Sequence, residues 1–223
     1  MKIGLFDSGI GGTTILEAIK KVLPNEEYKY LADSQNCPYG EKPYSELKTI
    51  VKNNVEVLKN WGAKIIVIAC NTATVKCIAF LRQQYPELQF VGTEPAIKLA
   101  TDTNAKNILV MATPNTINST HLQSLIKENQ KPHQAIQLLA CPGLADLIEH
   151  NYPQNNTTPI LDYLEKLFQK VTTTPEIIVL GCTHYPLIKP EIQSFFKTAK
   201  LIDDSANVAR QVEELVKNPK NLL

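Results

Sequence analysis

Short apolar runs alternate along the whole chain with segments of helical periodicity. The apolar runs, rich in β-branched residues, predict eight strands, at 3–6, 28–32, 65–69, 88–91, 108–111, 136–140, 177–180 and 201–202. Between them, apolar residues recur every three or four positions, which predicts helices over 15–23, 47–61, 75–79, 122–126, 160–171 and 208–216, the last capped by Ser205. Strands that are buried on both faces and separated by helices are typical of a parallel α/β sheet.

The two halves of the chain share a sequence pattern. Residues 65–72 read IIVIACNT and residues 177–184 read IIVLGCTH, so in each a strand ends in a small residue followed by cysteine. A weaker match joins residues 5–8 to residues 110–113. We interpret the pattern as two similar domains of about 100 residues, with coincidence as the alternative. Ligands in such sheets bind at the carboxyl ends of strands, where Cys70 and Cys182 would occupy equivalent positions.

Composition and charge exclude several classes of protein. The 223 residues are 43% hydrophobic and include 23 basic and 22 acidic side chains, for a net charge of +1. A protein that binds nucleic acid or an anionic membrane normally has an excess of basic residues, which this chain lacks. A disordered chain normally has fewer apolar residues than this one. No run approaches the roughly 20 apolar residues of a membrane span. The amino terminus turns acidic and glycine-rich too early for a secretory signal, so we expect a cytoplasmic protein.

The five cysteines are odd in number and include no Cys-x-x-Cys pair. In a reducing compartment, such cysteines are buried apolar residues or reactive thiols rather than disulfides. A single buried cysteine is usually part of a core, but Cys70 and Cys182 lie in matching contexts, which favours chemistry. Cys77, at a core position of a helix, and Cys141, at the end of an apolar strand, are expected to be structural.

His184 lies two residues after Cys182 and is predicted to be on a loop. A histidine there can support a thiolate or donate a proton near neutral pH. Zinc binding is the competing interpretation, but the second short ligand pair that would favour it is missing.

A glycine-rich turn, DSGIGGTT at residues 7–14, follows the first strand and begins a helix. It suggests a phosphate cradle, yet it lacks the Gly-Lys-Ser/Thr ending of a P-loop, and Thr14 replaces the third glycine of a dinucleotide-binding pattern. Asp7 would also repel a pyrophosphate. An acid beside helix-terminal amides suits instead a ligand with both a cation and an anion; a plain tight turn is the alternative.

Two other segments contain candidate ligand-binding groups. Residues 37–40, CPYG, predict a surface turn in which Tyr39 and Gly40 offer a phenol and backbone amides to a ligand. Glu149 and His150 end a short predicted helix, where a solvated helix end is the alternative to a functional role.

Taken together, these motifs resemble those of the aspartate/glutamate racemase family. The matching stretches are FDSGIGG at 6–12, CPYG at 37–40, ACNTA at 69–73 and GCTHYP at 181–186, with weaker matches in VGTEPA at 91–96 and ACP at 140–142. They follow the family's order over nearly the whole chain. The two cysteine motifs together are highly specific, whereas the glycine turn alone is not.

The resemblance implies an isomerase that interconverts L- and D-glutamate without cofactor or metal and supplies D-glutamate for peptidoglycan synthesis. It implies a homodimer of chains with two α/β domains, residues 1–94 with 204–223 and residues 95–203, and an active site in the cleft between them. The catalytic acid/base residues would be Cys70 and Cys182, with Asp7 assisting the first and Glu149 and His184 the second. The matching substrate-binding positions are Asp7, Ser8, Tyr39, Gly40, Asn71, Thr72, Thr183 and His184, with Thr113 and Thr116 as weaker matches.

Two features depart from the family's pattern. The tail after Arg210 is shorter than usual, which leaves open how the closing helices of the first domain are completed. No extension precedes the first strand, so the family's amino-terminal activator site for a peptidoglycan precursor is expected to be absent.

The chemistry of racemisation agrees with the paired cysteines. Inverting an amino acid requires one group that removes the α-proton and a second, on the opposite face, that returns one. Thiols, with an unperturbed pKa near 8.5, can take either role. No lysine motif for pyridoxal phosphate is present, so the carbanion would need hydrogen-bond donors such as Asn71, Thr72 and Thr183. The alternatives are an aspartate racemase, a non-catalytic binding protein of the same fold and a thiol redox protein.

Overall fold

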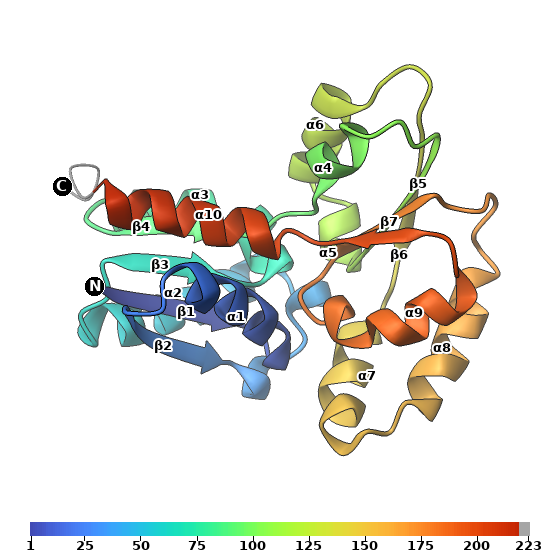
Figure 1. Cartoon of the computed structure of the whole chain (residues 1–223). Helices are drawn as coiled ribbons and strands as arrows, with labels where there is room; N and C mark the ends of the chain where they lie inside the picture. Colours follow the sequence, from blue (N-terminus) through green and yellow to red (C-terminus); the bar gives the residue numbers. More distant parts are fainter. Residues whose placement is uncertain (219–223) are drawn as a thin grey trace. The chain divides into compact units, whose positions relative to one another are not determined.

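The computed structural model describes residues 1–218, which fold into two compact units (Figure 1). One unit comprises Met1–Glu94 and the segment that begins at Asp204, and the other spans Pro95–Asp203. Each unit contains a four-stranded parallel sheet with helices on both faces. The predicted α/β fold with two parallel sheets is therefore confirmed.

The first unit has the strand order β2-β1-β3-β4. Its strands are β1 (Lys2–Asp7), β2 (Glu27–Ala32), β3 (Ile65–Ile68) and β4 (Gln89–Gly92). Its α-helices are α1 (Thr13–Val22), α2 (Tyr44–Asn60), α3 (Asn71–Gln84) and α10 (Ser205–Lys217), and short 3-10 helices cover Ile10–Gly12, Ser34–Asn36 and Tyr39–Glu41.

The second unit has the order β6-β5-β7-β8, which is the order of the first sheet with each strand replaced by its counterpart. Its strands are β5 (Asn107–Ala112), β6 (Ala135–Ala140), β7 (Ile177–Gly181) and β8 (Lys200–Ile202). Its helices are α4 (Ile97–Thr101), α5 (Pro114–Ile117), α6 (Thr120–Asn129), α7 (Leu144–Asn151), α8 (Thr158–Phe168) and α9 (Lys189–Phe195), with 3-10 helices at Tyr152–Gln154 and Tyr185–Ile188. The shared topology agrees with the repeated sequence pattern.

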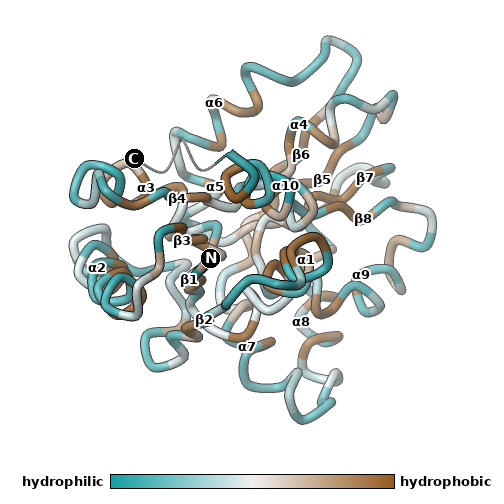
Figure 2. The backbone as a smooth tube through the Cα atoms, turned by 60° about the vertical axis from the view of Figure 1, so that its left-hand side comes forward, coloured by the Kyte–Doolittle hydropathy of each residue, from teal (hydrophilic) through white to brown (hydrophobic). Residues whose placement is uncertain are grey.

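The sheets are buried on both faces because alternate strand residues pack against different helices. In β1, Ile3 and Leu5 pack in the cluster that includes α1 and α10, whereas Phe6 packs in the cluster that includes α2 and α3. Figure 2 shows α1 and α10 each carrying both hydrophobic and hydrophilic stretches, as expected for helices with one face on a sheet. In the second unit, Val110 packs with α4 and α6, and Met111 with α7, α8 and α9.

The structure corrects three expectations about helices. Helix α3 begins at Asn71, earlier than the predicted residue 75, because its first turn buries polar side chains that give no apolar periodicity. Helix α10 begins at Ser205, so the N-cap position belongs to Asp204, whose Oδ1 accepts a hydrogen bond from the side-chain amide of Asn207 at 3.0 Å. Helices α4, α5 and α9 were not predicted, since four to seven residues are too few for a periodic signal. Within residues 1–218, no helix is long and apolar enough to cross a membrane.

Candidate active site

Cys70 lies at the amino-terminal end of a helix. The buried strand β3 ends at Ile68, and two residues later Cys70 occupies the N-cap position of the 14-residue helix α3. Burial raises the pKa of its thiol well above the ordinary value, and the negative charge of Asp7 raises it further. Hydrogen bonds with the Ala73 amide, the Ser8 hydroxyl and the Thr72 amide act in the opposite direction. The net rise keeps Cys70 protonated at neutral pH.

Asp7 is fully buried at the end of β1, where its carboxylate faces the start of α1. Its Oδ2 accepts a hydrogen bond from the Gly12 amide at 2.8 Å. A Cβ atom at Gly12 would lie 2.8 Å from Asp7 Cβ and 2.9 Å from Ala69 Cβ, so only glycine allows this approach. Asp7 therefore occupies the place at the helix amino terminus where a bound phosphate would accept hydrogen bonds, which argues against a phosphate cradle.

Small polar groups surround Cys70 within the same unit. Ser8 is buried, and its Oγ lies 4.0 Å from Cys70 Sγ. Asn71 and Thr72 follow Cys70 in the first turn of α3 and are also buried. These side chains place hydroxyl and amide groups at the carboxyl ends of β1 and β3.

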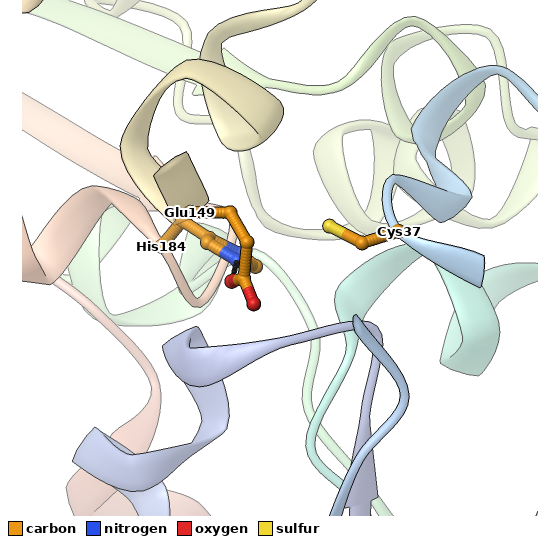
Figure 3. Close-up of side chains that lie close together, drawn as sticks. All are labelled: Cys37, Glu149 and His184. Atoms are coloured by element: carbon orange, nitrogen blue, oxygen red, sulfur yellow. Dashed lines mark hydrogen bonds and ion pairs between the residues drawn. The ribbon is translucent and has the colours of Figure 1, made fainter. Parts of the chain in front are cut away.

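Cys182 occupies the equivalent position in the second unit, directly after β7, and has a different set of partners. Its Sγ lies 3.9 Å from Nδ1 of His184. Nε2 of His184 lies 2.8 Å from Oε2 of Glu149, and Figure 3 shows these two side chains close together. A carboxylate accepts only, so Nε2 carries the hydrogen of this bond. In the neutral imidazole, Nδ1 is then the unprotonated nitrogen and can accept the thiol proton of Cys182.

Two neighbouring residues of helix α7, Glu149 and His150, differ in burial and in their partners, although they were grouped together from the sequence. The Glu149 side chain is only 9% exposed and contacts His184, whereas His150 is 71% exposed and pairs with Asp146 on the same helix. The interpretation of a solvated helix end is therefore wrong for Glu149 and correct for His150. His184 itself is fully buried in the turn between β7 and the following 3-10 helix.

The segment that contains Tyr39 is not the surface turn that was predicted. Tyr39 is 1% exposed and Gly40 is also buried. The Tyr39 hydroxyl donates to Oδ2 of Asp33 at 2.5 Å and accepts from the Asn54 side chain at 2.9 Å. Burial and this bond to Asp33 raise the pKa of Tyr39 well above its usual value. The phenol is therefore hydrogen-bonded to Asp33 and Asn54 inside the protein, whereas the prediction placed it at the surface.

Comparison with known proteins identifies the family. The family model for Asp/Glu/Hydantoin racemase matches residues 13–212. A glutamate racemase of Clostridium novyi is 40% identical over 98% of this chain and 85% of its own length, and one from Clostridium botulinum is 37% identical over 99% and 85%. The chain belongs to the Asp/Glu/hydantoin racemase family. Among solved structures, Escherichia coli glutamate racemase, in complex with L-glutamate and the activator UDP-MurNAc-ala, superimposes with a TM-score of 0.89, 29% identity and coverage of 97% of this chain and 82% of that one.

In this member of the racemase family, the predicted site residues form one cluster in each unit. Cys70 lies near Asp7, Ser8, Asn71 and Thr72 in the first, and Cys182 is followed directly by Thr183 and contacts the His184–Glu149 pair in the second. Thr113 and Thr116 lie at the carboxyl end of β5, where Thr113 Oγ1 donates to Thr116 Oγ1 at 3.1 Å. Both threonines are buried. Their hydroxyls therefore stabilise the short helix α5, whatever further role they have.

Three residues that contact the predicted site residues or the glycine turn were missed from the sequence: Asp33, Asn54 and Tyr30. Asp33 had a detectable signal, because it is an acid that directly follows a predicted strand, as Asp7 does. In the structure its backbone amide donates to the Asp7 carbonyl at 2.9 Å. Asn54 is a half-buried polar residue of α2, and Tyr30 lies inside an edge strand. Neither position differs in pattern from ordinary surface residues.

Proposed function

We propose that this racemase interconverts L- and D-glutamate by a two-thiol acid/base mechanism that needs no cofactor and no metal. The observation that supports it most strongly is the matched placement of Cys70 and Cys182, which follow the third strands of two sheets of the same topology. The relatives at 37–40% identity are named glutamate racemases, which supports glutamate as the substrate. In this proposal the two cysteines act on opposite faces of one α-carbon.

The Cys182 thiolate forms by transfer of the thiol proton to His184. The imidazolium is stabilised by the Glu149 carboxylate at 2.8 Å, an arrangement in which an acid orients and supports a histidine that activates a nucleophile or base. The thiolate then removes the α-proton of L-glutamate, and the electron pair of the C–H bond remains on the α-carbon as a carbanion.

Cys70 delivers a proton to the opposite face. Its raised pKa keeps the sulfur protonated at rest, so it is ready to act as the acid. In the reverse direction Cys70 must be the base, and there the substrate's ammonium group, paired with Asp7, would offset the negative charge that raises the thiol pKa. Asp7 therefore has a role in both binding and acid/base chemistry.

The developing carbanion is stabilised by polar groups at the strand ends. Ser8, Asn71, Thr72 and Thr183 provide hydroxyl and amide donors, which would bind the substrate carboxylate as negative charge spreads into it. Fixed donors of this kind stabilise a transition state strongly in a buried site. The backbone of Tyr39 and Gly40 would add further donors.

The biological role follows from the product. D-glutamate made here would serve peptidoglycan synthesis, and we propose that the enzyme acts in the cytoplasm as a homodimer. Size-exclusion chromatography with light scattering measures the assembly directly: a mass near twice 24.9 kDa supports the dimer, and a mass of 24.9 kDa contradicts it.

Circular dichroism of D-glutamate incubated with purified protein tests the function. The signal should decay to zero without added cofactor, and exhaustive dialysis against EDTA should leave the rate unchanged. D-aspartate, assayed in parallel, tests the main alternative, since one methylene changes transition-state binding by only about 1–3 kcal/mol. A higher kcat/KM for aspartate would make the chain an aspartate racemase. No change with either amino acid would favour a binding or redox protein of this fold.

A further inference from the structure

Tyr30, on the edge strand β2, contacts the glycine turn beside Asp7. Its hydroxyl donates to the backbone carbonyl of Gly9 at 2.5 Å. The same oxygen lies 2.8 Å from the place where a Cβ atom of Gly12 would be. Tyr30 therefore contacts both ends of the turn from Gly9 to Gly12.

This turn determines where two site residues lie. The amide of Gly12 holds the Asp7 carboxylate at 2.8 Å. Ser8 directly precedes Gly9, and its hydroxyl lies 4.0 Å from Cys70 Sγ. A shift of the turn would therefore move both Asp7 and Ser8 relative to Cys70.

We infer that Tyr30 is a positioning residue, whose hydroxyl holds the glycine turn and so fixes Asp7 and Ser8 beside Cys70. The inference rests on the proposed function, in which those two residues serve the Cys70 thiol. Residues that orient metal ligands through one intervening contact commonly change activity 10–100-fold when removed, and we expect a similar effect for a residue that orients acid/base groups. An error of about 1 Å in such a site can cost 10²-fold in rate.

The same strand provides a matched control. Tyr28 and Tyr30 both pack against the cluster that includes α1 and α10, and the Tyr28 hydroxyl also donates to a backbone carbonyl at 2.5 Å. Its acceptor is Leu23, at the carboxyl end of α1, whereas Gly9 and Gly12 precede that helix. Tyr28→Phe therefore removes a hydrogen bond of the same kind away from Asp7.

The first measurement compares steady-state kinetics of the two variants. Tyr30→Phe should lower kcat/KM for glutamate about 10–100-fold, and Tyr28→Phe should change it less than about threefold. The two melting temperatures should fall by similar amounts, since each variant loses one bond to a carbonyl. Equal kinetic effects of the two variants would overturn the inference.

The second measurement does not depend on catalysis. The rate of Cys70 alkylation by iodoacetamide is followed against pH by peptide mass spectrometry, with Cys182 as the internal reference. Tyr30→Phe should move the Cys70 profile to lower pH, because the Asp7 charge is no longer fixed beside the thiol, and should leave the Cys182 profile in place. Tyr28→Phe should move neither.

An unchanged Cys70 profile in Tyr30→Phe would contradict the positioning role. Failure of the wild-type protein to racemise glutamate would refute the proposed function instead, and the alkylation profiles would still decide what Tyr30 does.

Discussion

The imidazole of His184 is held by Glu149, with Nε2 and Oε2 2.8 Å apart and both side chains largely shielded from solvent. This bond fixes both the orientation of the ring and the nitrogen that carries its hydrogen. The other nitrogen then faces the sulfur of Cys182 at 3.9 Å. In the second unit, His184 thus lies between the thiol of Cys182 and the carboxylate of Glu149. In the first unit no histidine intervenes among the described residues, and the charge of Asp7 acts directly on the pKa of Cys70.

Glu149→Gln should lower kcat/KM about 10–100-fold, because the neutral amide no longer stabilises an imidazolium. The pH dependence of kcat/KM should shift as well, since proton transfer from Cys182 becomes harder. Steady-state kinetics from pH 6 to pH 9 measures both effects.

Asp146→Asn is the matched control for this variant. Asp146 lies on the same helix and also pairs with a histidine, but that histidine is exposed. The control should retain wild-type kinetics, because exposed ion pairs contribute little. Equal losses in the two variants would show that α7 stability, rather than the buried pair, explains the effect.

Cys70→Ser and Cys182→Ser should each lower kcat by at least about 10²–10⁴-fold, the usual contribution of one positioned acid or base. A serine hydroxyl has a far higher pKa than a thiol and needs further activation to act as a base. Cys77→Ser, a substitution in the core of the first unit, should reduce stability and leave turnover in place. Loss of turnover in folded Cys77→Ser would show that the site is assigned to the wrong cysteines.

Gly12→Ala should destabilise the protein by about 1–3 kcal/mol, because the new methyl group would lie 2.8–2.9 Å from three neighbouring atoms. One of those atoms is the hydroxyl oxygen of Tyr30. The double variant with Tyr30→Phe should therefore lose less stability than the sum of the single variants. Urea unfolding of the four proteins measures this coupling, and strict additivity would show that the two residues do not contact each other.

Stability should fall as the solution becomes alkaline, because several buried thiols keep their protons in the folded state. Burial raises the pKa of Cys77 to about 11 and that of Cys141 to about 12, well above the ordinary value of a thiol. At a pH between the ordinary thiol pKa and the raised value, the thiol has lost its proton in the unfolded chain and keeps it in the folded chain. Over this pH range each thiol lowers the free energy of unfolding by about 1.4 kcal/mol per pH unit.

Cys77→Ala should therefore show a shallower decline than the wild type. The free energy of unfolding in urea, measured from pH 8 to pH 11, gives both slopes. Parallel slopes would mean that the Cys77 thiol titrates alike in the folded and unfolded chains.

Much of the architecture could be predicted from apolar patterning. The central strands β1, β3, β5 and β7 are buried on both faces, so each appears as an unbroken apolar run. The start of α3 could not be predicted in this way, because Asn71 and Thr72 are buried there without being apolar. Departures from a local rule are expected where residues serve function rather than packing.

Cys70, Cys182 and Asp7 were found because they follow predicted strands, and the other candidates were found from turns, a helix end and the family resemblance. The environments of these residues could not be read from the sequence. The Tyr39 hydroxyl is bonded to Asp33 and Asn54, and Asn54 lies on a helix 15 residues further along the chain. The distinction between Glu149 and His150 depends on which side of α7 faces His184. Both features depend on contacts between residues far apart in the chain, and the spacing of apolar residues along the sequence contains no information about such contacts.

Solvent deuterium incorporation tests the two-thiol mechanism most directly. L-glutamate is incubated with the enzyme in D2O, stopped below a tenth of full conversion and separated by chirality, and proton NMR measures the α-position in each pool. With Cys70 and Cys182 on opposite faces, early D-glutamate should carry deuterium, delivered by a thiol that has exchanged with solvent, while the remaining L-glutamate stays almost unlabelled. Substantial protium in the product, or deuterium in the remaining substrate, would indicate a single base that serves both faces and would contradict the mechanism.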